Sequence, residues 1–223
     1  MIKLMGKEYR GCIFDLDGTL LNTLEDITDS MNNVLEKRNL PLRTVEEIKI
    51  FVGDGLRTLV LKSLPESIRY DFEEECLLEM REAYALKCHE KTYKYEGIDK
   101  LIDYLIKNMV KMGVLSNKAD DFTKKITEHY FGSGLFSSII GETEGMPRKP
   151  APDGALKIAK EFSIKPAEMI YIGDTNGDMF TAINSGMFPI GAGWGFRGED
   201  ELRESGARVI LKNPAQLITM MSQ

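Results

Sequence analysis

Two aspartates followed by a glycine carry the first chemical signal in the chain. Asp15 and Asp17 stand two residues apart in the segment FDLDGTL, directly after the apolar run at residues 12–14. If that run is a buried strand, both carboxylates leave it at the end where open α/β sheets bind ligands. Gly18 lets the backbone turn sharply, so that Gly18 and Thr19 can face an anionic substrate. A D-x-D pair alone is more often a polar turn, so the other motifs must decide its role.

A calcium loop is an alternative interpretation of the same segment. Asp15, Asp17 and Asp26 occupy positions one, three and twelve of a twelve-residue window. The glycine required at position six is Leu20 here, and a strand-like run rather than a helix precedes the loop. The calcium interpretation is therefore disfavoured.

Two later segments offer groups that suit an anion. The segment VLSNK ends a second predicted strand with Ser116 and Asn117, whose hydroxyl and amide groups suit an anion ahead of a helix. A helix cap explains these two residues about as well when they are taken alone. In the segment RKPAPD, two prolines hold the loop extended and can aim Lys149 at a site. Most lone lysines are solvated surface charges, so this interpretation requires an anionic site nearby.

A fourth segment supplies acids for such a site. The segment MIYIGDTNGD ends another apolar run with Asp174, and Asp178 follows one helical turn later. If the strands before Asp15 and Asp174 are neighbours, the two carboxylates make an oxygen-lined pocket that suits a hard cation such as magnesium. Asp178 is expected to act from behind these ligands. Lys149 would then have the anionic site that its role requires.

The strands that must position these motifs recur along the chain. Strand-like runs lie at residues 12–14, 110–115, 138–140, 169–172, 188–190 and 208–211. Helical patterns lie between them, and one apolar helical face is marked by Ile98, Leu101, Ile102, Leu105 and Met109. This alternation is typical of βαβ units and predicts an α/β fold with a Rossmann-like, parallel-sheet core.

The segment from residue 22 to residue 93 breaks this alternation, because it shows helical spacing and no convincing strand. Thr23 with Asp26 is a candidate N-terminal cap for its first helix. We therefore predict a core of residues 1–21 and 94–223 that is interrupted by an inserted α-helical domain of residues 22–93.

Taken in order, the motifs resemble those of the haloacid dehalogenase (HAD) superfamily, and in particular its phosphoglycolate phosphatase-like members. D-x-D-G-T, a strand-end serine, K-P-x-P and G-D-T-x-x-D follow one another, and a helical cap domain is inserted after the first motif. The resemblance covers essentially the whole chain. It implies a HAD-like fold and a magnesium-dependent phosphatase that hydrolyses a small phosphorylated metabolite through an aspartyl phosphate. The chain departs from the family pattern at two places near the hinges of the cap. Residues 22–23 (NT) stand where the family usually has an Asp-Ser pair, and residues 95–97 (YEG) stand where it usually has Y-P-G.

The resemblance also implies roles for individual residues. Asp15 resembles the nucleophile and Asp17 the general acid/base, and Lys149 resembles the cation that shields the phosphate. Ser116 resembles a phosphate ligand, and Asn117 is expected to contact substrate beside it. The acids implied for the Mg²⁺ site are Asp15, Asp17, Asp174 and Asp178.

Substrate choice in such enzymes is expected to come from the cap. The loop FVGDGLR at residues 51–57 is best suited to face the site, because its glycines permit a close approach. Arg57 is a candidate ligand for a substrate carboxylate, although an ordinary surface arginine is equally compatible with the sequence. The segment GAGWG at residues 191–195 fails the dinucleotide fingerprint, since Phe196 stands where the last glycine belongs.

Composition excludes several classes of partner. The 223 residues carry a net charge of −6, which argues against nucleic acid as the main partner. Three cysteines without a C-x-x-C pair predict reduced thiols, and no run approaches the roughly 20 apolar residues that cross a bilayer. We expect a cytoplasmic protein that does not bind membranes and is a monomer or homodimer.

Other functions compete with the phosphatase interpretation. A phosphosugar mutase similar to β-phosphoglucomutase would use the same Asp15 and Asp17 but return the phosphoryl group to a sugar. A dehalogenase is disfavoured, because Asp17 and the magnesium acids serve phosphoryl transfer. A non-catalytic binding protein is disfavoured by the complete set of Asp15, Asp17, Lys149 and Asp174. Phosphate release without a bisphosphate activator would favour hydrolysis over the mutase.

Overall fold

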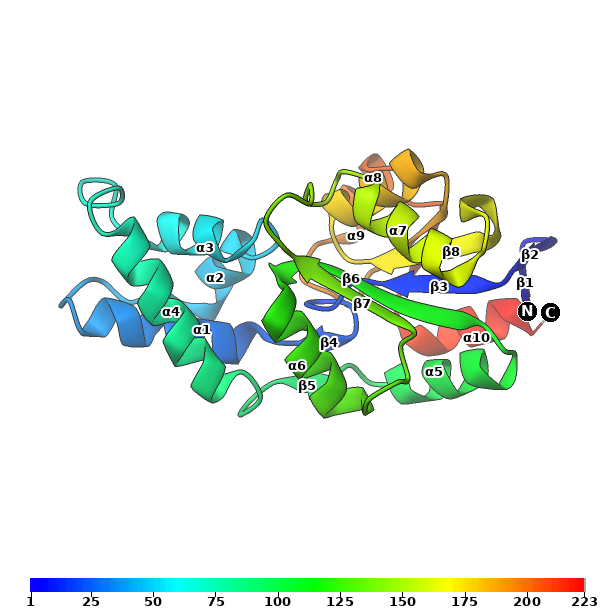
Figure 1. The fold of residues 1–223 in the computed structure, drawn as a ribbon, viewed down its shortest axis with the longest axis horizontal. Coiled ribbons are helices and arrows are strands. Elements are labelled where there is room, and N and C mark those ends of the chain that lie inside the picture. The colour runs from blue at the N-terminus through cyan, green and yellow to red at the C-terminus, as the bar shows by residue number, and fades with distance from the viewer. Residues whose placement is uncertain (223) are drawn as a thin grey trace.

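A six-stranded sheet forms the core of the structure, a computed structural model that describes residues 1–222 (Figure 1). The strand order is β10-β9-β8-β3-β6-β7, and every neighbouring pair is parallel. The strands are β3 (Gly11–Phe14), β6 (Lys111–Ala119), β7 (Ser138–Glu142), β8 (Met169–Gly173), β9 (Phe188–Ala192) and β10 (Val209–Leu211). The prediction of an α/β fold with a parallel core is confirmed.

Helices cover both faces of this sheet, which explains why the central strands are continuous apolar runs. Figure 1 shows α7 and α8 on one face and α5 and α10 on the other. Along β3 the side chains alternate between the two apolar clusters, with Ile13 facing α7 and α8 while Cys12 and Phe14 face the other side. These core helices are α5 (Ile98–Lys107), α6 (Asp120–Phe131), α7 (Asp153–Phe162), α8 (Asn176–Ser185), α9 (Glu199–Glu204) and α10 (Pro214–Met221).

The strand order decides which loops meet. β3 lies between β8 and β6, with Phe14 opposite both Ile172 and Val114. The segments that leave these three strands therefore emerge side by side at one edge of the sheet. Smaller elements complete the core, namely the hairpin of β1 (Ile2–Leu4) and β2 (Lys7–Tyr9), and the short 3-10 helix η1 (Pro166–Glu168).

One residue of the predicted α5 face lies elsewhere. Ile98, Leu101, Ile102 and Leu105 are buried as expected, whereas Met109 is 86% exposed. The helix ends at Lys107, and Met109 has a φ of 54° beyond that end. Because the chain has left helical geometry there, helical spacing no longer predicts the direction of the Met109 side chain.

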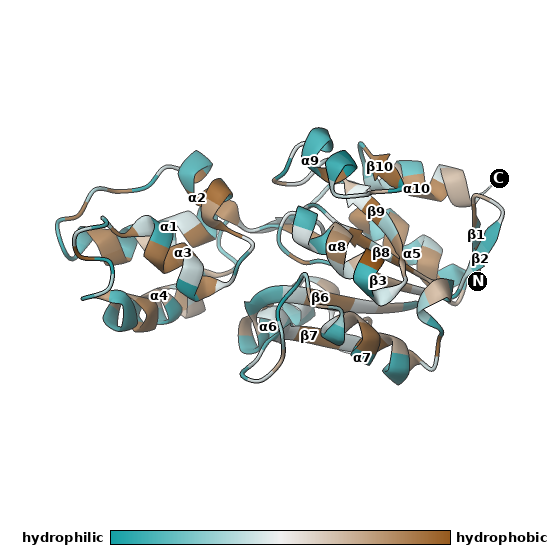
Figure 2. Cartoon of the chain, turned by 90° about the horizontal axis from the view of Figure 1, so that it is seen from above, coloured by the Kyte–Doolittle hydropathy of each residue, from teal (hydrophilic) through white to brown (hydrophobic). Residues whose placement is uncertain are grey.

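Four helices form a separate unit at one end of the sheet (Figures 1 and 2). They are α1 (Leu24–Glu36), α2 (Val45–Phe51), α3 (Leu56–Ser63) and α4 (Glu73–Lys87). We call residues 22–93 the cap. These helices support a division into core and cap. The exact boundaries of the two domains stay a prediction. Within residues 1–222, none of the helices is both long and apolar enough to cross a bilayer.

The two connections between cap and core pair with each other. β4 (Leu21–Asn22) and β5 (Tyr93–Lys94) form a short antiparallel ladder. Next to it, the buried Asp26 accepts hydrogen bonds from the backbone amides of Lys91 and Thr92, at 2.9 and 2.8 Å. Asp26 therefore holds the returning chain instead of capping α1. Its carboxylate is occupied by these contacts and is not a ligand of a calcium loop.

Candidate active site

Gly18 shapes the turn that follows the first strand. It has a φ of +87°, and a Cβ built at this position would lie 2.2 Å from Oδ2 of Asp174. Neither the backbone conformation nor the space admits a side chain. Thr19 is fully buried, and its hydroxyl donates to Oδ1 of Asp174 at 3.3 Å. The two residues predicted to contact substrate thus lie against Asp174 and position it.

Three carboxylates meet at the edge of the sheet. Asp15 follows β3, Asp174 follows β8, and Asp178 lies in the first turn of α8. All three are buried, and each offers an oxygen within 4.8 Å of the others. Asp178, which the resemblance placed among the metal-site acids, belongs to this cluster, because a capping box with Thr175 holds its carboxylate at the start of α8.

Lys149 is the cation that enters this cluster. Its ammonium donates to Asp15 at 2.6 Å and to Asp178 at 2.8 Å. Asn117 fixes the loop, since it accepts from the backbone amide of Lys149 at 2.9 Å and donates to the carbonyl of the same residue at 3.2 Å. The sequence prediction that a stiff loop aims Lys149 at an anionic site agrees with this geometry.

The cluster carries more negative charge than Lys149 can balance. Burial raises the pKa of Asp15, the neighbouring Asp178 raises it further, and Lys149 lowers it only in part. Burial and the same two acids, Asp15 and Asp178, also raise the pKa of Asp174 well above its ordinary value. Buried, crowded carboxylate oxygens are the donor set that hard divalent cations prefer. Asp15, Asp174 and Asp178 therefore fit a hard divalent cation.

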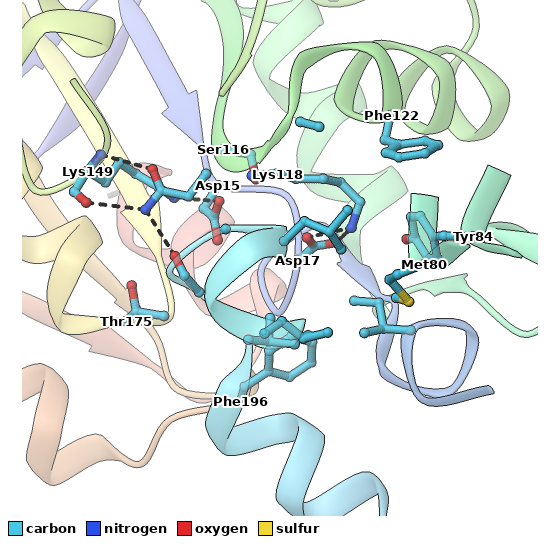
Figure 3. Close-up of a pocket in the computed structure, with 18 of the residues that line it drawn as sticks. Asp15, Asp17, Met80, Tyr84, Ser116, Lys118, Phe122, Lys149, Thr175 and Phe196 are labelled. Atoms are coloured by element: carbon cyan, nitrogen blue, oxygen red, sulfur yellow. Dashed lines mark hydrogen bonds and ion pairs between the residues drawn. The ribbon is translucent and has the colours of Figure 1, made fainter. Parts of the chain in front are cut away.

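Asp17 lies apart from the three acids. Its carboxylate accepts from the ammonium of Lys118 at 2.8 and 3.0 Å and from the hydroxyl of Thr23 at 2.7 Å. These two partners hold the side chain on the opposite side of the site from Lys149 (Figure 3). We therefore leave the Asp17 carboxylate out of the ligand set, which corrects the sequence expectation. Thr23 donates to Asp17 and makes no side-chain cap to α1.

Lys118 is a site residue that sequence reasoning missed. Its ammonium pairs with Asp17 and also lies 4.7 Å from the ring centroid of Tyr84 in the cap. Burial would lower the pKa of Lys118, but the Asp17 carboxylate and the neighbouring Tyr84 together more than offset this, and the net pKa is raised. The available signal was the position of Lys118 directly after Ser116 and Asn117 at the end of β6, where the argument that selected those two residues also applies.

A narrow cavity, with about 60 Å³ of space that water-sized molecules can enter, connects these groups beneath the cap. Asp15, Lys149 and Ser116 lie along one part of it, and Asp17 and Lys118 lie nearer to the cap residue Tyr84 (Figure 3). The cap contributes a mainly apolar wall. Its lining residues are Ile27, Val52, Gly53, Gly55, Leu56, Leu59, Met80 and Tyr84.

Three core residues hold the cap loop over the cavity. Asn117 donates to the carbonyl of Gly53 at 2.9 Å, and Arg148 donates to that of Asp54 at 2.9 Å. Arg197 donates to three backbone carbonyls at the end of α2, where the loop begins, including that of Val52 at 3.0 Å. The predicted loop therefore faces the site, and Arg197 is a second residue that sequence reasoning missed.

Arg57 does not reach the cavity in the described part of the chain. Its guanidinium is paired with Glu73 and Glu74 of α4, the latter at 2.7 Å. Leu56 and Leu59 line the cavity from the same helix, α3, and Arg57 is not among the lining residues. The expectation that Arg57 binds a substrate carboxylate is corrected, because two acids of the cap itself already satisfy its charge.

The motif order and this geometry agree with a comparison against known families. A family model described as haloacid dehalogenase-like hydrolase matches residues 12–192. The chain belongs to this family. Its sequence is 28% identical to phosphoglycolate phosphatase 1 of Pseudomonas aeruginosa over 216 residues, which cover 95% of this chain and 79% of that protein.

Further relatives extend over the full length of the fold. Phosphoglycolate phosphatase of Vibrio parahaemolyticus is 24% identical, with 94% of each chain covered. A crystal structure from Lactobacillus delbrueckii subsp. bulgaricus superposes with a TM-score of 0.89 and 31% identity, covering 97% of this chain and 100% of that one. The predicted superfamily membership and the prediction of a hydrolytic enzyme of the phosphatase type are confirmed.

Proposed function

We propose that this chain is a magnesium-dependent phosphatase that hydrolyses a small phosphorylated metabolite through an aspartyl phosphate on Asp15. The observation that carries the proposal is the contact of Lys149 with Asp15 inside a buried cluster of three acids, at the bottom of a cavity that the cap covers. Relatives along the whole chain are phosphoglycolate phosphatases, so phosphoglycolate is the first substrate to test.

The negative charge of the cluster must be neutralised before an anionic nucleophile can approach a phosphate. Asp15, Asp174 and Asp178 would hold the magnesium ion, which supplies positive charge to the phosphate oxygens when it is bound. Lys149 adds a second positive charge in contact with Asp15. The hydroxyl of Ser116, which lines the same cavity, is placed to bind a phosphate oxygen.

The reaction then has two steps. In the first, which requires Asp17 to be protonated in the substrate complex, an oxygen of Asp15 forms a bond to phosphorus, the bond from phosphorus to the ester oxygen breaks, and Asp17 gives its proton to the departing oxygen. In the second, Asp17 takes a proton from a water molecule that attacks the phosphorus. Inorganic phosphate leaves and the Asp15 carboxylate is restored. The separation of Asp17 from the three acids suits this role, because its carboxylate faces the part of the cavity next to the cap.

Phosphate release from phosphoglycolate, measured with and without magnesium, tests the proposal directly. Rapid quenching followed by mass spectrometry should find one phosphoryl group on Asp15. Release that needs no bisphosphate activator is expected for a phosphatase, whereas a mutase would require one. No phosphate release from any small ester, or a phosphoryl group on another aspartate, would refute the mechanism. A cytoplasmic location and a monomeric or homodimeric state stay predictions.

A further inference from the structure

The cap wall of the cavity contains one polar side chain. Of the cap residues that line the cavity, taken over the described residues 1–222, all but Tyr84 are glycine, aliphatic residues or methionine. Tyr84 lies on α4 and is 2% exposed. Within this cavity, the hydroxyl of Tyr84 is therefore the side-chain group with which the cap can form a hydrogen bond to a substrate.

No hydrogen bond of ordinary geometry joins the Tyr84 hydroxyl to any described residue, although the Lys118 ammonium lies close enough to lower its pKa. A buried hydroxyl without a partner is unfavourable, so such groups usually mark a place where something else binds. The pKa of Tyr84 is raised by burial, which keeps the hydroxyl protonated and able to donate. Figure 3 shows the hydroxyl pointing toward Lys118 and Asp17.

Neighbouring side chains fix the Tyr84 ring. Phe122 of the core packs edge-on against it, with ring centroids 5.2 Å apart and an interplanar angle of 81°. The ammonium of Lys118 lies over the ring at 4.7 Å from the centroid, a distance typical of a cation–π contact. The hydroxyl is thus held in one direction before any ligand arrives, which reduces the entropic cost of binding.

We propose that the Tyr84 hydroxyl and the Lys118 ammonium form a subsite for an anionic oxygen on the leaving group of the substrate. This inference rests on the proposed phosphatase function and assigns Tyr84 as a specificity-determining residue. An oxygen anion placed there accepts one hydrogen bond from the hydroxyl and faces a positive charge, so it satisfies the unpartnered donor.

The geometry also limits the length of the substrate. The Lys118 ammonium lies 2.8 Å from the Asp17 carboxylate, which would protonate the ester oxygen. An ester oxygen bound to Asp17 and an anionic oxygen bound to Lys118 are therefore only a few ångströms apart. This spacing fits an alcohol with one or two carbons between its ester oxygen and its anionic group. The anion is either a carboxylate or a second phosphate, since both present the same acceptor oxygens.

Tyr84→Phe tests the subsite, because it removes the hydroxyl and keeps the ring that Lys118 and Phe122 contact. Phosphate release would be measured for phosphoglycolate, for ethylene glycol bisphosphate, and for ethyl phosphate, which has no anionic group on its alcohol. Removal of a hydrogen bond to a charged group corresponds to a fall of about ten- to a hundredfold in kcat/KM. We expect this loss for at least one of the two anionic substrates and a change of less than about threefold for ethyl phosphate. The anionic substrate with the larger loss identifies the natural anion.

Tyr130→Phe is the matched control. Its hydroxyl donates to the carbonyl of Thr92 at 2.7 Å, away from the cavity lining. Loss of this hydroxyl should leave the ratios between the kcat/KM values of the three esters unchanged. Thermal unfolding gives a second measurement: Tyr84→Phe should keep or raise the melting temperature, because the lost hydroxyl has no partner in the free protein.

Three results would overturn the subsite. They are an equal loss for all three esters, no loss for either anionic ester, and a clear fall in the melting temperature of Tyr84→Phe, which would show that the hydroxyl is a structural bond. Failure of the proposed function is distinguishable from these, since the unmodified enzyme would then release phosphate from none of the esters, and the subsite would fall with it.

Discussion

The core and the cap line one cavity with opposite chemistry. On the core side, Asp15 and Lys149 form one ion pair, and Asp17 and Lys118 form another. On the cap side the wall is apolar, with one hydroxyl. Asp15, Asp17 and Lys118 stand at or just beyond the ends of buried parallel strands, and Lys149 lies in the loop before α7, whereas the cap approaches through a loop and a short hinge ladder. This difference supports the proposal that the rigid sheet supplies the chemistry and that the cap supplies substrate choice.

Asp15→Asn should cause the largest loss, because it removes the nucleophile from the core side. Turnover should fall to near background even with an activated aryl phosphate, and quenched samples should contain no phosphoenzyme. Asp103→Asn, which changes an exposed acid on α5, is the control and should keep full activity. Persistent phosphorylation of the Asp15→Asn protein at another aspartate would contradict the assignment.

Asp17→Asn should cost about a hundred- to ten-thousandfold in turnover of an alkyl phosphate, the usual value of positioned proton transfer. The loss should shrink with an aryl phosphate, whose leaving group needs little protonation. A phosphoenzyme on Asp15 should then accumulate, because the attacking water lacks its base. An equal loss for both leaving groups would show that Asp17 does not transfer the proton.

Asp174→Asn should raise the magnesium concentration that the enzyme needs for activity. It removes one of three charged oxygens from the proposed ligand set, so we expect the magnesium concentration for half-maximal activity to rise at least about tenfold. Asp17→Asn is the comparison, since its carboxylate lies outside the cluster and its loss should leave that concentration nearly unchanged. A similar shift in both variants would return Asp17 to the ligand set.

Arg197→Ala should give the smallest of these effects. The guanidinium ties the core to three backbone carbonyls of the cap, so its loss should raise KM by about three- to tenfold with little effect on an early burst of phosphoenzyme. Arg57→Ala is the matched control, because Arg57 pairs with Glu73 and Glu74 outside the cavity lining. If Arg57→Ala raised KM as much as Arg197→Ala, the comparison of core and cap would have to be redrawn.

The sequence predicted the parts of the site that follow from strand ends. Asp15 and Asp174 each come directly after a short apolar run, and the carboxyl ends of parallel strands meet at one edge of the sheet. The same reasoning placed Ser116 at that edge. Lys149 was predicted through the two prolines that follow it, because they restrict the backbone locally.

Only the tertiary structure decided which way the remaining side chains face. Asp17 pairs with Lys118, 101 residues away in the chain, and Asp178 joins the cluster through a helix cap. Local patterns identify an element and its period, but the direction of a charged side chain depends on which partner from a distant segment comes within hydrogen-bond distance. For the same reason the sequence suggested Arg57 as a substrate ligand, although acids of the cap pair with it. The sequence did not single out Tyr84, because its hydroxyl lacks a hydrogen bond only inside a cavity that forms when cap and core come together.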